Sequence, residues 1–171
     1  MTLSSNNKIL APGPFLEQFP FEMVMALSWR QPYGTLMLYD KEETRRWRTK
    51  YRGWVLICTS KKPYDEYFIR EISGPAQHAR IHTMLQMEAS NSVSKNMPNT
   101  AQFHGYAIAI GRIAECNEMG RHDEFRCYVE YYPGLFRHRY RNVHRIKPFP
   151  CKGQQGFKKL TQSDLEKIIV L

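Results

Sequence analysis

Residues 105–116 read GYAIAIGRIAEC, and this stretch decides the fold class. Large side chains at Tyr106, Ile108 and Ile110 alternate with alanine or glycine at the positions between them. Side chains that alternate along the chain point to opposite faces of a β-strand. The alternation therefore predicts a strand with one closely packed face.

Apolar runs on both sides of this stretch predict further strands. Residues 22–29 and 53–59 are short and apolar, residues 125–131 alternate, and residues 136–146 are expected to pair with them as a hairpin. Two helices are expected, over about 64–72 and 75–88, separated by Ser73 and Gly74. Five or six short strands with small peripheral helices predict an α+β fold. A closed β-barrel is expected because closure removes exposed strand edges.

Length and composition predict one domain. The chain has 171 residues, 42% of them hydrophobic, which suffices for one core. Prolines at 12, 14 and 20 disfavour helix, so residues 1–20 are expected to form an arm and residues 21–171 the folded domain. No segment approaches the roughly 18 apolar residues of a membrane span, so no membrane partner is expected.

The cysteines bear on the compartment. Cys58, Cys116, Cys127 and Cys151 are widely separated, with no pair at zinc-ligand spacing. We expect free, partly buried thiols in a reducing compartment, and therefore a cytoplasmic protein.

Positive charge is concentrated in two segments. The chain carries a net charge of +9, and residues 44–52 and 136–152 together hold 11 of its 25 lysines and arginines and no carboxylate. Trp47 and Tyr51 lie among the cations of the first segment. Concentrated positive charge with aromatic rings suits a phosphate backbone and stacked bases. A nucleic-acid partner is expected, RNA in preference to DNA.

The second segment predicts a basic face on a strand. If residues 136–147 form a strand, alternation places one set of cations on the same face. This set is Arg137, Arg139, Arg141, Arg145 and Lys147. His138 and Tyr140 fall on the other face. The face suits a run of phosphates, and a solvated outer face is the alternative.

Two further patterns bear on chemistry. Lys41 and Thr44 can point the same way on a helix end or tight turn, where a lysine can act as a base and a threonine as a nucleophile. A purely structural or electrostatic role is the alternative. His78 and His82 have the spacing of a zinc-binding pair on a helix, but no third ligand is evident in the sequence. We therefore expect no metal site and no cofactor.

Read in order, the segments resemble an ASCH domain, the activating-signal-cointegrator homology module of the PUA-like superfamily. The matching segments are Ala26-Leu27-Ser28-x-Arg30-Gln31-Pro32, Lys41-x-x-Thr44-x-Arg46-Trp47, Arg52-Gly53-Trp54-Val55-Leu56-Ile57, residues 105–113 and Lys147-Pro148-x-Pro150-x-Lys152-Gly153-x-x-Gly156, with Leu160 at the end. The resemblance covers about residues 21–160. The family's Gly-x-Lys-x-x-Glu-x-Arg pattern is altered here, because Tyr39 replaces its glycine and Thr44 its glutamate.

The resemblance implies a PUA-like barrel with a cleft that holds RNA or a single extruded, modified base. The residues expected to border the cleft or contact the nucleic acid are Ser28, Arg30, Gln31, Lys41, Arg46, Trp47, Arg137, Arg139, Tyr140, Arg141, Lys147 and Lys152. Trp29, Trp47 or Tyr140 is expected either to stack on a base or to belong to the core.

Two other functions stay open. Small ASCH proteins that hydrolyse acylated cytidine nucleosides have a similar Lys-x-x-Thr arrangement completed by an acidic residue, and other members are similar to ribonucleases. Lys41 and Thr44 would then be catalytic, with Glu43, Glu115 or Glu130 as the carboxylate. A protein-interaction scaffold that presents the basic face to an acidic partner is the third possibility.

Overall fold

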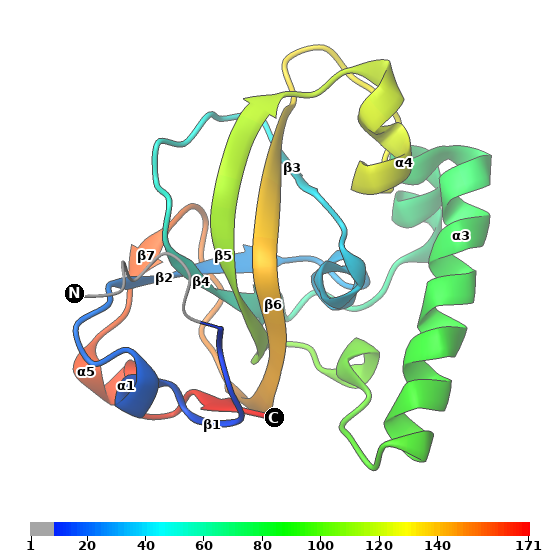
Figure 1. Ribbon diagram of the computed structural model, residues 1–171. Coiled ribbons are helices and arrows are strands. Elements are labelled where there is room, and N and C mark those ends of the chain that lie inside the picture. Colours follow the sequence, from blue (N-terminus) through cyan, green and yellow to red (C-terminus); the bar gives the residue numbers. More distant parts are fainter. Residues whose placement is uncertain (1–8) are drawn as a thin grey trace.

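The computed structural model describes residues 9–171, and its centre is a strongly curled β-sheet (Figure 1). The strands of this described part are β1 (Gly13–Pro14), β2 (Val24–Trp29), β3 (Glu43–Arg45), β4 (Trp54–Thr59), β5 (Tyr106–Glu118), β6 (Phe136–Pro150), β7 (Lys158–Lys159) and β8 (Ile169–Val170). Their order in the sheet is β1-β8-β6-β5-β4-β2-β7, and β3 pairs with the far end of β6. The sheet curls into a half-barrel.

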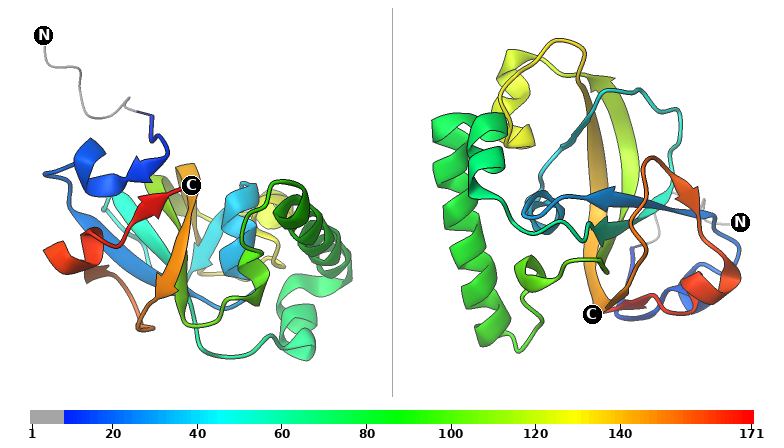
Figure 2. Two further views of the ribbon diagram at one scale, coloured as in Figure 1. Left: turned by 90° about the horizontal axis from the view of Figure 1, so that it is seen from below. Right: turned by 180° about the vertical axis from the view of Figure 1, so that it is seen from behind.

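Short helices connect the strands, and one long helix packs beside the sheet. The helices within the described residues are α1 (Phe15–Gln18), α2 (Tyr33–Leu36), η2 (Met37–Tyr39), α3 (Glu66–Ser94), η3 (Thr100–Gln102), η4 (Arg121–Asp123), α4 (Glu124–Cys127) and α5 (Gln162–Leu165). Seen from behind, α3 and α4 lie on one side of the sheet, and α1 and α5 lie on the opposite side (Figure 2). The α+β prediction is confirmed, with eight strands in the described part rather than five or six.

The expected central strands form the core. Every residue of β4 is buried, and Ile108 and Ile110 of β5 are fully buried on its two faces. Directly after Ile110, Gly111 lies so close to β6 that an added side chain would press on Val143. The strand itself is therefore confirmed, but Ile108 and Ile110 belong to opposite core clusters rather than to one face, because the register of β5 with both neighbours shifts between Ala107 and Ala109.

Residues 125–131 do not form the predicted strand. The first three of them belong to α4, and Tyr128 takes a left-handed backbone conformation at φ 59° that ends the helix. Cys127, Tyr128 and Val129 are buried consecutively, which a half-exposed strand would not allow. The hairpin partner of β6 is β5 instead. The alternation of apolar and polar residues over 125–131 was therefore a weak signal, and burial of three consecutive residues is incompatible with the strand that it predicted.

Residues before position 21 are not all an arm outside the folded unit. Residues 1–8 lie outside the described part of the chain. From Leu10 onward the chain is packed, because Phe15 is fully buried against Trp54 and β1 pairs with β8. The prolines of this segment exclude a long helix but not burial of the phenylalanines.

The cysteines differ from the prediction as well. Cys58 of β4 and Cys151, 93 residues later, form a disulfide, with Cα atoms 6.4 Å apart. Cys116 and Cys127 are free and buried. The pairing could not be foreseen from the spacing of the cysteines, because the fold brings the two distant positions together. The disulfide removes the argument for a reducing compartment that relied on four free thiols.

Within residues 9–171, no helix combines the length and the apolar character that crossing a membrane requires.

Candidate functional site

A pocket of about 200 Å³ lies beside β3, between the end of β2 and the first part of α3. We call it the β3 pocket. Its lining residues are Ser28, Trp29, Arg30, Tyr33, Lys41, Glu43, Thr44, Arg45, Phe68, Ile72 and Val129. Polar and charged side chains make up about half of this lining, and aromatic or apolar side chains make up the rest. Such a lining suits a ligand with both a flat apolar surface and polar edges.

Lys41 and Glu43 form a buried ion pair in this pocket. The Lys41 Nζ lies 2.8 Å from Glu43 Oε2, and the two side chains are 1% and 8% exposed. Lys41 also donates to the Glu42 carbonyl oxygen at 2.9 Å. An ammonium group has three N–H donors, so one remains for a ligand in addition to these two bonds.

Two cations share the Glu43 carboxylate. Arg45 Nε lies 3.0 Å from Glu43 Oε1, on the side opposite Lys41. Burial raises the pKa of Glu43, but Lys41 and Arg45 outweigh burial and hold that pKa below its usual range. Glu43 is therefore ionised at neutral pH, and the group of three carries one uncompensated positive charge.

Thr44 supplies a free hydroxyl next to this group. It belongs to β3 directly after Glu43, and among the described residues its hydroxyl has no hydrogen-bond partner. Tyr33 also lines the pocket, with its ring centre 5.5 Å from the Lys41 Nζ. Its hydroxyl shares a 2.7 Å hydrogen bond with Ser73, and burial raises its pKa to about 12. Tyr33 therefore stays neutral, and its ring is available as a packing surface.

One wall of the β3 pocket comes from the first part of α3. Phe68 and Ile72 are four residues apart on this helix and both line the pocket. The Arg30 guanidinium stacks on Phe68, 3.7 Å from the ring centre, and pairs with Asp65 at 3.1 Å. The position of this wall therefore depends on where the first turns of α3 lie relative to β2.

A second pocket of about 400 Å³ continues from the first. Thr44, Ile72 and Val129 line both. The second pocket, which we call the Tyr132 pocket, also has Arg46 on its wall, with the guanidinium 5.7 Å from the centre of the exposed Tyr132 ring. Glu71 and Glu130 line it too, so its charge is mixed.

Four of the residues predicted from the sequence meet in the β3 pocket: Ser28, Arg30, Lys41 and Thr44. Ser28 also fixes the loop after β6, because its Oγ accepts a 3.1 Å hydrogen bond from the Gln154 backbone. This contact brings the end of β2 next to the loop that follows β6.

Three other residues that were predicted to border the cleft or contact nucleic acid instead make contacts within the protein. Gln31 is 1% exposed, and its amide Nε2 donates to the carbonyl oxygens of Thr100 and Phe103, so it does not line the cleft as predicted. Trp47 packs edge-on against His138, with ring centres 4.9 Å apart. Tyr140 is buried against Trp29. None of these three side chains lines the β3 pocket.

The predicted basic face on β6 is only partly present, and it is not free of acids. Arg137, Arg139 and Arg141 do face away from the buried His138 and Tyr140. Each of the three arginines is paired, however, and the carboxylates involved are Glu42, Glu115 and Asp123. These ion pairs could not be predicted from the β6 segment alone, because the carboxylates come from other parts of the chain.

Arg145 does not belong to this face at all. Asn142 has φ 51° and the β5–β6 register shifts between Ile110 and Arg112, so the alternation changes phase. Arg145 then turns to α3, where it forms a pair with the fully buried Glu88, the closest atoms being 2.6 Å apart. A bulge of this kind has no reliable signature in the sequence.

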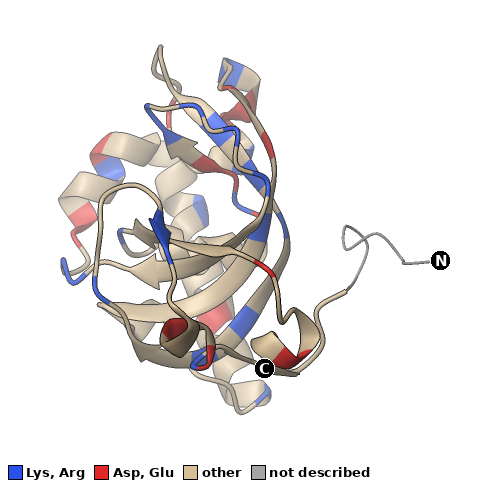
Figure 3. Ribbon diagram, turned by 90° about the vertical axis from the view of Figure 1, so that its left-hand side faces the viewer, with Lys and Arg blue, Asp and Glu red and all other residues tan. Residues whose placement is uncertain are grey.

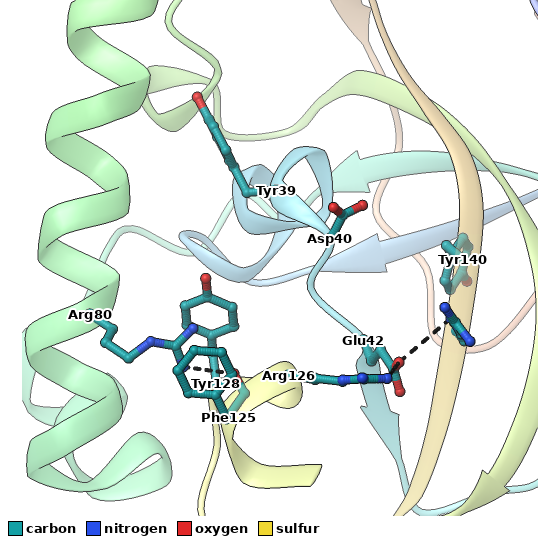
Figure 4. A pocket seen from close by; sticks show the side chains of 9 residues that line it. Tyr39, Asp40, Glu42, Arg80, Phe125, Arg126, Tyr128 and Tyr140 are labelled. Atoms are coloured by element: carbon teal, nitrogen blue, oxygen red, sulfur yellow. Dashed lines mark hydrogen bonds and ion pairs between the residues drawn. The ribbon is translucent and has the colours of Figure 1, made fainter.

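A third pocket, of about 360 Å³, surrounds Glu42 on the α3 side (Figure 4). Glu42 is 4% exposed and lies 2.6 Å from Arg137 and 3.6 Å from Arg126. On the far wall Arg80 stacks on Phe125. The cations here already have carboxylate or aromatic partners, so this pocket is poorly suited to bind an anionic ligand.

The exposed cations lie elsewhere. Figure 3 faces the side of the molecule with β7 and the β3–β4 connection, and basic residues are spread over both. The exposed cations of these segments and of the β6–β7 loop include Arg46, Lys50, Arg52, Lys152, Lys158 and Lys159. Lys147 is exposed on β6. Arg46 and Lys152 therefore keep the accessibility that phosphate contact requires.

The main residue that the sequence left undecided is Glu43. It was one of three possible carboxylates, and the structure places it, rather than Glu115 or Glu130, against Lys41. Alternation along a strand offers a signal, since positions 41 and 43 share a face. Phe68 and Ile72 had no such signal, because nothing in the sequence relates α3 to β3.

No protein-family model matches the chain. A search of curated proteins likewise finds no match.

Proposed function

We propose that the β3 pocket binds a single unpaired or modified base of a nucleic acid. The observation that carries this proposal is the convergence of Lys41, Glu43 and Thr44 in one small pocket with aromatic walls. The free Thr44 hydroxyl and the remaining Lys41 N–H are suited to the polar edge of a base. Tyr33 and Phe68 offer surfaces for its ring.

The size of the pocket favours one ring system over a larger ligand. At about 200 Å³ it is smaller than the roughly 300–1,000 Å³ of pockets for drug-sized ligands. The Tyr132 pocket continues from it, and Arg46 beside Tyr132 is a cation next to an exposed ring. This pair suits a neighbouring phosphate or base, so a strand fits the surface better than a free nucleoside does.

The preference for RNA rests on the resemblance to ASCH domains. We propose that the curled sheet is a PUA-like barrel of that type. The β2 end, the β3 segment and the loop after β6 would then form the family's cleft. The contact of Gln154 with Ser28 supports this assignment, because it joins two of the segments on which the resemblance depends.

The binding proposal is tested by the fluorescence anisotropy of labelled oligoribonucleotides. We expect the affinity of the wild-type protein to fall with salt. Thr44→Val should weaken binding about five- to tenfold, which corresponds to one lost hydrogen bond. Thr83→Val is the matched control, because Thr83 is exposed on α3 outside the pocket.

A second pair of variants tests the backbone contact. Arg46→Ala should weaken binding and reduce the salt dependence by about one counterion. Lys95→Ala, which removes the same charge at the far end of α3, should do neither. Binding that responds equally to the pocket variants and their controls would sink the proposal, and so would an absence of binding.

A second candidate function is hydrolysis of an acyl amide on the base, and the Lys41–Glu43 pair beside Thr44 favours it. In this reaction water adds to the amide carbonyl, the C–N bond breaks, and a carboxylic acid and an amine are released. The ionised Glu43 could accept the proton of the water, and Lys41 could stabilise the charge on the carbonyl oxygen. Release of cytidine from N4-acetylcytidine by the wild type but not by Lys41→Met would establish it.

A further inference from the structure

Three side chains with metal-ligating atoms meet beside the bend in α3. Glu66 Oε1 lies 2.6 Å from His78 Nε2 and 2.9 Å from His82 Nε2. The ligand atoms of all three residues lie within 4.8 Å of one another. The cluster is outside the three pockets described above.

The bend explains how residues distant in sequence meet. Gly74 has φ 70° and ψ 167°, a conformation open mainly to glycine, and it divides α3 into two arms. The first arm returns alongside the second and brings Glu66 next to residues 12 and 16 positions later. His78 and His82 are one helical turn apart, with ring centres separated by 4.7 Å.

We propose that Glu66, His78 and His82 bind a divalent transition-metal ion of the zinc class. Two imidazoles and one carboxylate, with an open fourth position, form one of the recurrent ligand sets for zinc. Mg²⁺ and Ca²⁺ prefer oxygen ligands and do not suit two imidazoles. The sequence showed the histidine pair but not the third ligand, which the bend supplies.

The cluster can open to admit an ion. Zinc ligands lie about 2.0–2.2 Å from the metal, so the oxygen and nitrogens must separate by less than about 1 Å from their present contacts. Glu66 and His82 are 50% and 47% exposed, which leaves them free to rotate. Tyr64 donates a 2.7 Å hydrogen bond to the second Glu66 oxygen and can orient the carboxylate from outside the ligand shell.

The ion would also steady a wall of the β3 pocket, and this consequence rests on the proposed function. Glu66 is on the same short arm as Phe68 and Ile72, which line that pocket. The two histidines are on the long arm. An ion between the arms fixes one relative to the other. Metal would then strengthen binding of a base without touching it.

The test is calorimetric titration of the untagged, full-length protein with Zn²⁺, together with visible absorption on addition of Co²⁺. We expect one ion per chain and a cobalt spectrum of low coordination number. His82→Ala should weaken binding at least about tenfold, since even loss of an outer-shell partner costs about 10–100-fold. Glu66→Gln should weaken it while keeping the shape of the side chain.

His122→Ala is the control, because His122 is 84% exposed and outside the cluster. It should bind Zn²⁺ as the wild type does. The proposal is overturned if Zn²⁺ does not bind, if His82→Ala and His122→Ala bind equally, or if Mg²⁺ binds as tightly as Zn²⁺. Zinc binding without any nucleic-acid binding would leave this site standing and refute only the proposed function.

Discussion

The Nζ of Lys41 lies 2.8 Å from Oε2 of Glu43, and both side chains are almost wholly shielded from water at the wall of a small pocket. A buried ion pair is costly to desolvate and gives little net stability. Its position beside the free hydroxyl of Thr44 is therefore better explained by a ligand than by folding. The same pair makes the site sensitive to substitution of either partner.

Removing one partner of this pair should destabilise the protein more than removing both. Glu43→Gln leaves the Lys41 ammonium buried with one partner fewer, which should cost about 3–5 kcal/mol of unfolding free energy. The double variant Lys41→Met with Glu43→Gln should recover part of that loss while abolishing ligand binding. Urea unfolding measures both.

The exposed pair of Arg48 and Glu118 provides the comparison. Their side chains are 61% and 76% exposed, so Glu118→Gln should change the unfolding free energy by less than about 1 kcal/mol. If Glu43→Gln costs no more than this control, the Lys41–Glu43 pair is not buried as described.

Acid should weaken the protein through Glu88. Burial raises the pKa of this carboxyl, but hydrogen bonds from Arg145, Tyr39 and Thr100 outweigh burial and lower that pKa to about 2. A depressed pKa adds stability above the unfolded pKa near 4.5, and this stability is lost as the pH falls toward 2. The contribution at neutral pH is about 3 kcal/mol.

Chemical unfolding at a series of pH values separates the contribution of Glu88 from that of the other titratable groups. Glu88→Gln should be less stable than the wild type at pH 7, and the difference should shrink between about pH 4.5 and pH 2. Glu166→Gln, on the exposed surface, should follow the wild-type curve. A difference that stays constant with pH would mean that Glu88 does not ionise as described.

Reduction of the Cys58–Cys151 disulfide should lower the unfolding free energy. The bond closes a loop across 93 residues, and cross-links of such length contribute roughly 2–5 kcal/mol. Cys151→Ala should lose the same amount and show no further response to a reductant. A wild-type unfolding curve that a reductant leaves unchanged would show that the bond is absent in solution.

The sequence predicted what depends on local pattern and missed what depends on contacts across the fold. The alternation around Ile108 and the apolar run of β4 identified central strands, and the helix break at Gly74 was confirmed. The second arm of α3 nevertheless continues to Ser94, six residues into an expected loop. Helical propensity alone does not reveal where packing extends a helix.

The site divides in the same way. Lys41 and Thr44 are close in sequence, so their proximity was foreseeable. The acids that neutralise the β6 arginines come from other elements, and the bulge at Asn142 redirects Arg145, so neither was foreseeable. The charge pattern of the sequence therefore predicted more unpaired positive charge on β6 than the structure has. It did not predict the residues of α3 that line the β3 pocket.

The measurement that tests the central claim most directly compares two strands of equal length and charge, one with bases and one abasic. The reference strand is the tightest binder among four homopolymeric oligoribonucleotides. If the β3 pocket holds a base, the strand with bases should bind roughly tenfold or more tightly, as expected for one stacked and hydrogen-bonded base. Thr44→Val should reduce this difference in affinity between the two strands. Equal affinity for the two strands would show that only the phosphate backbone is bound, and would contradict the account.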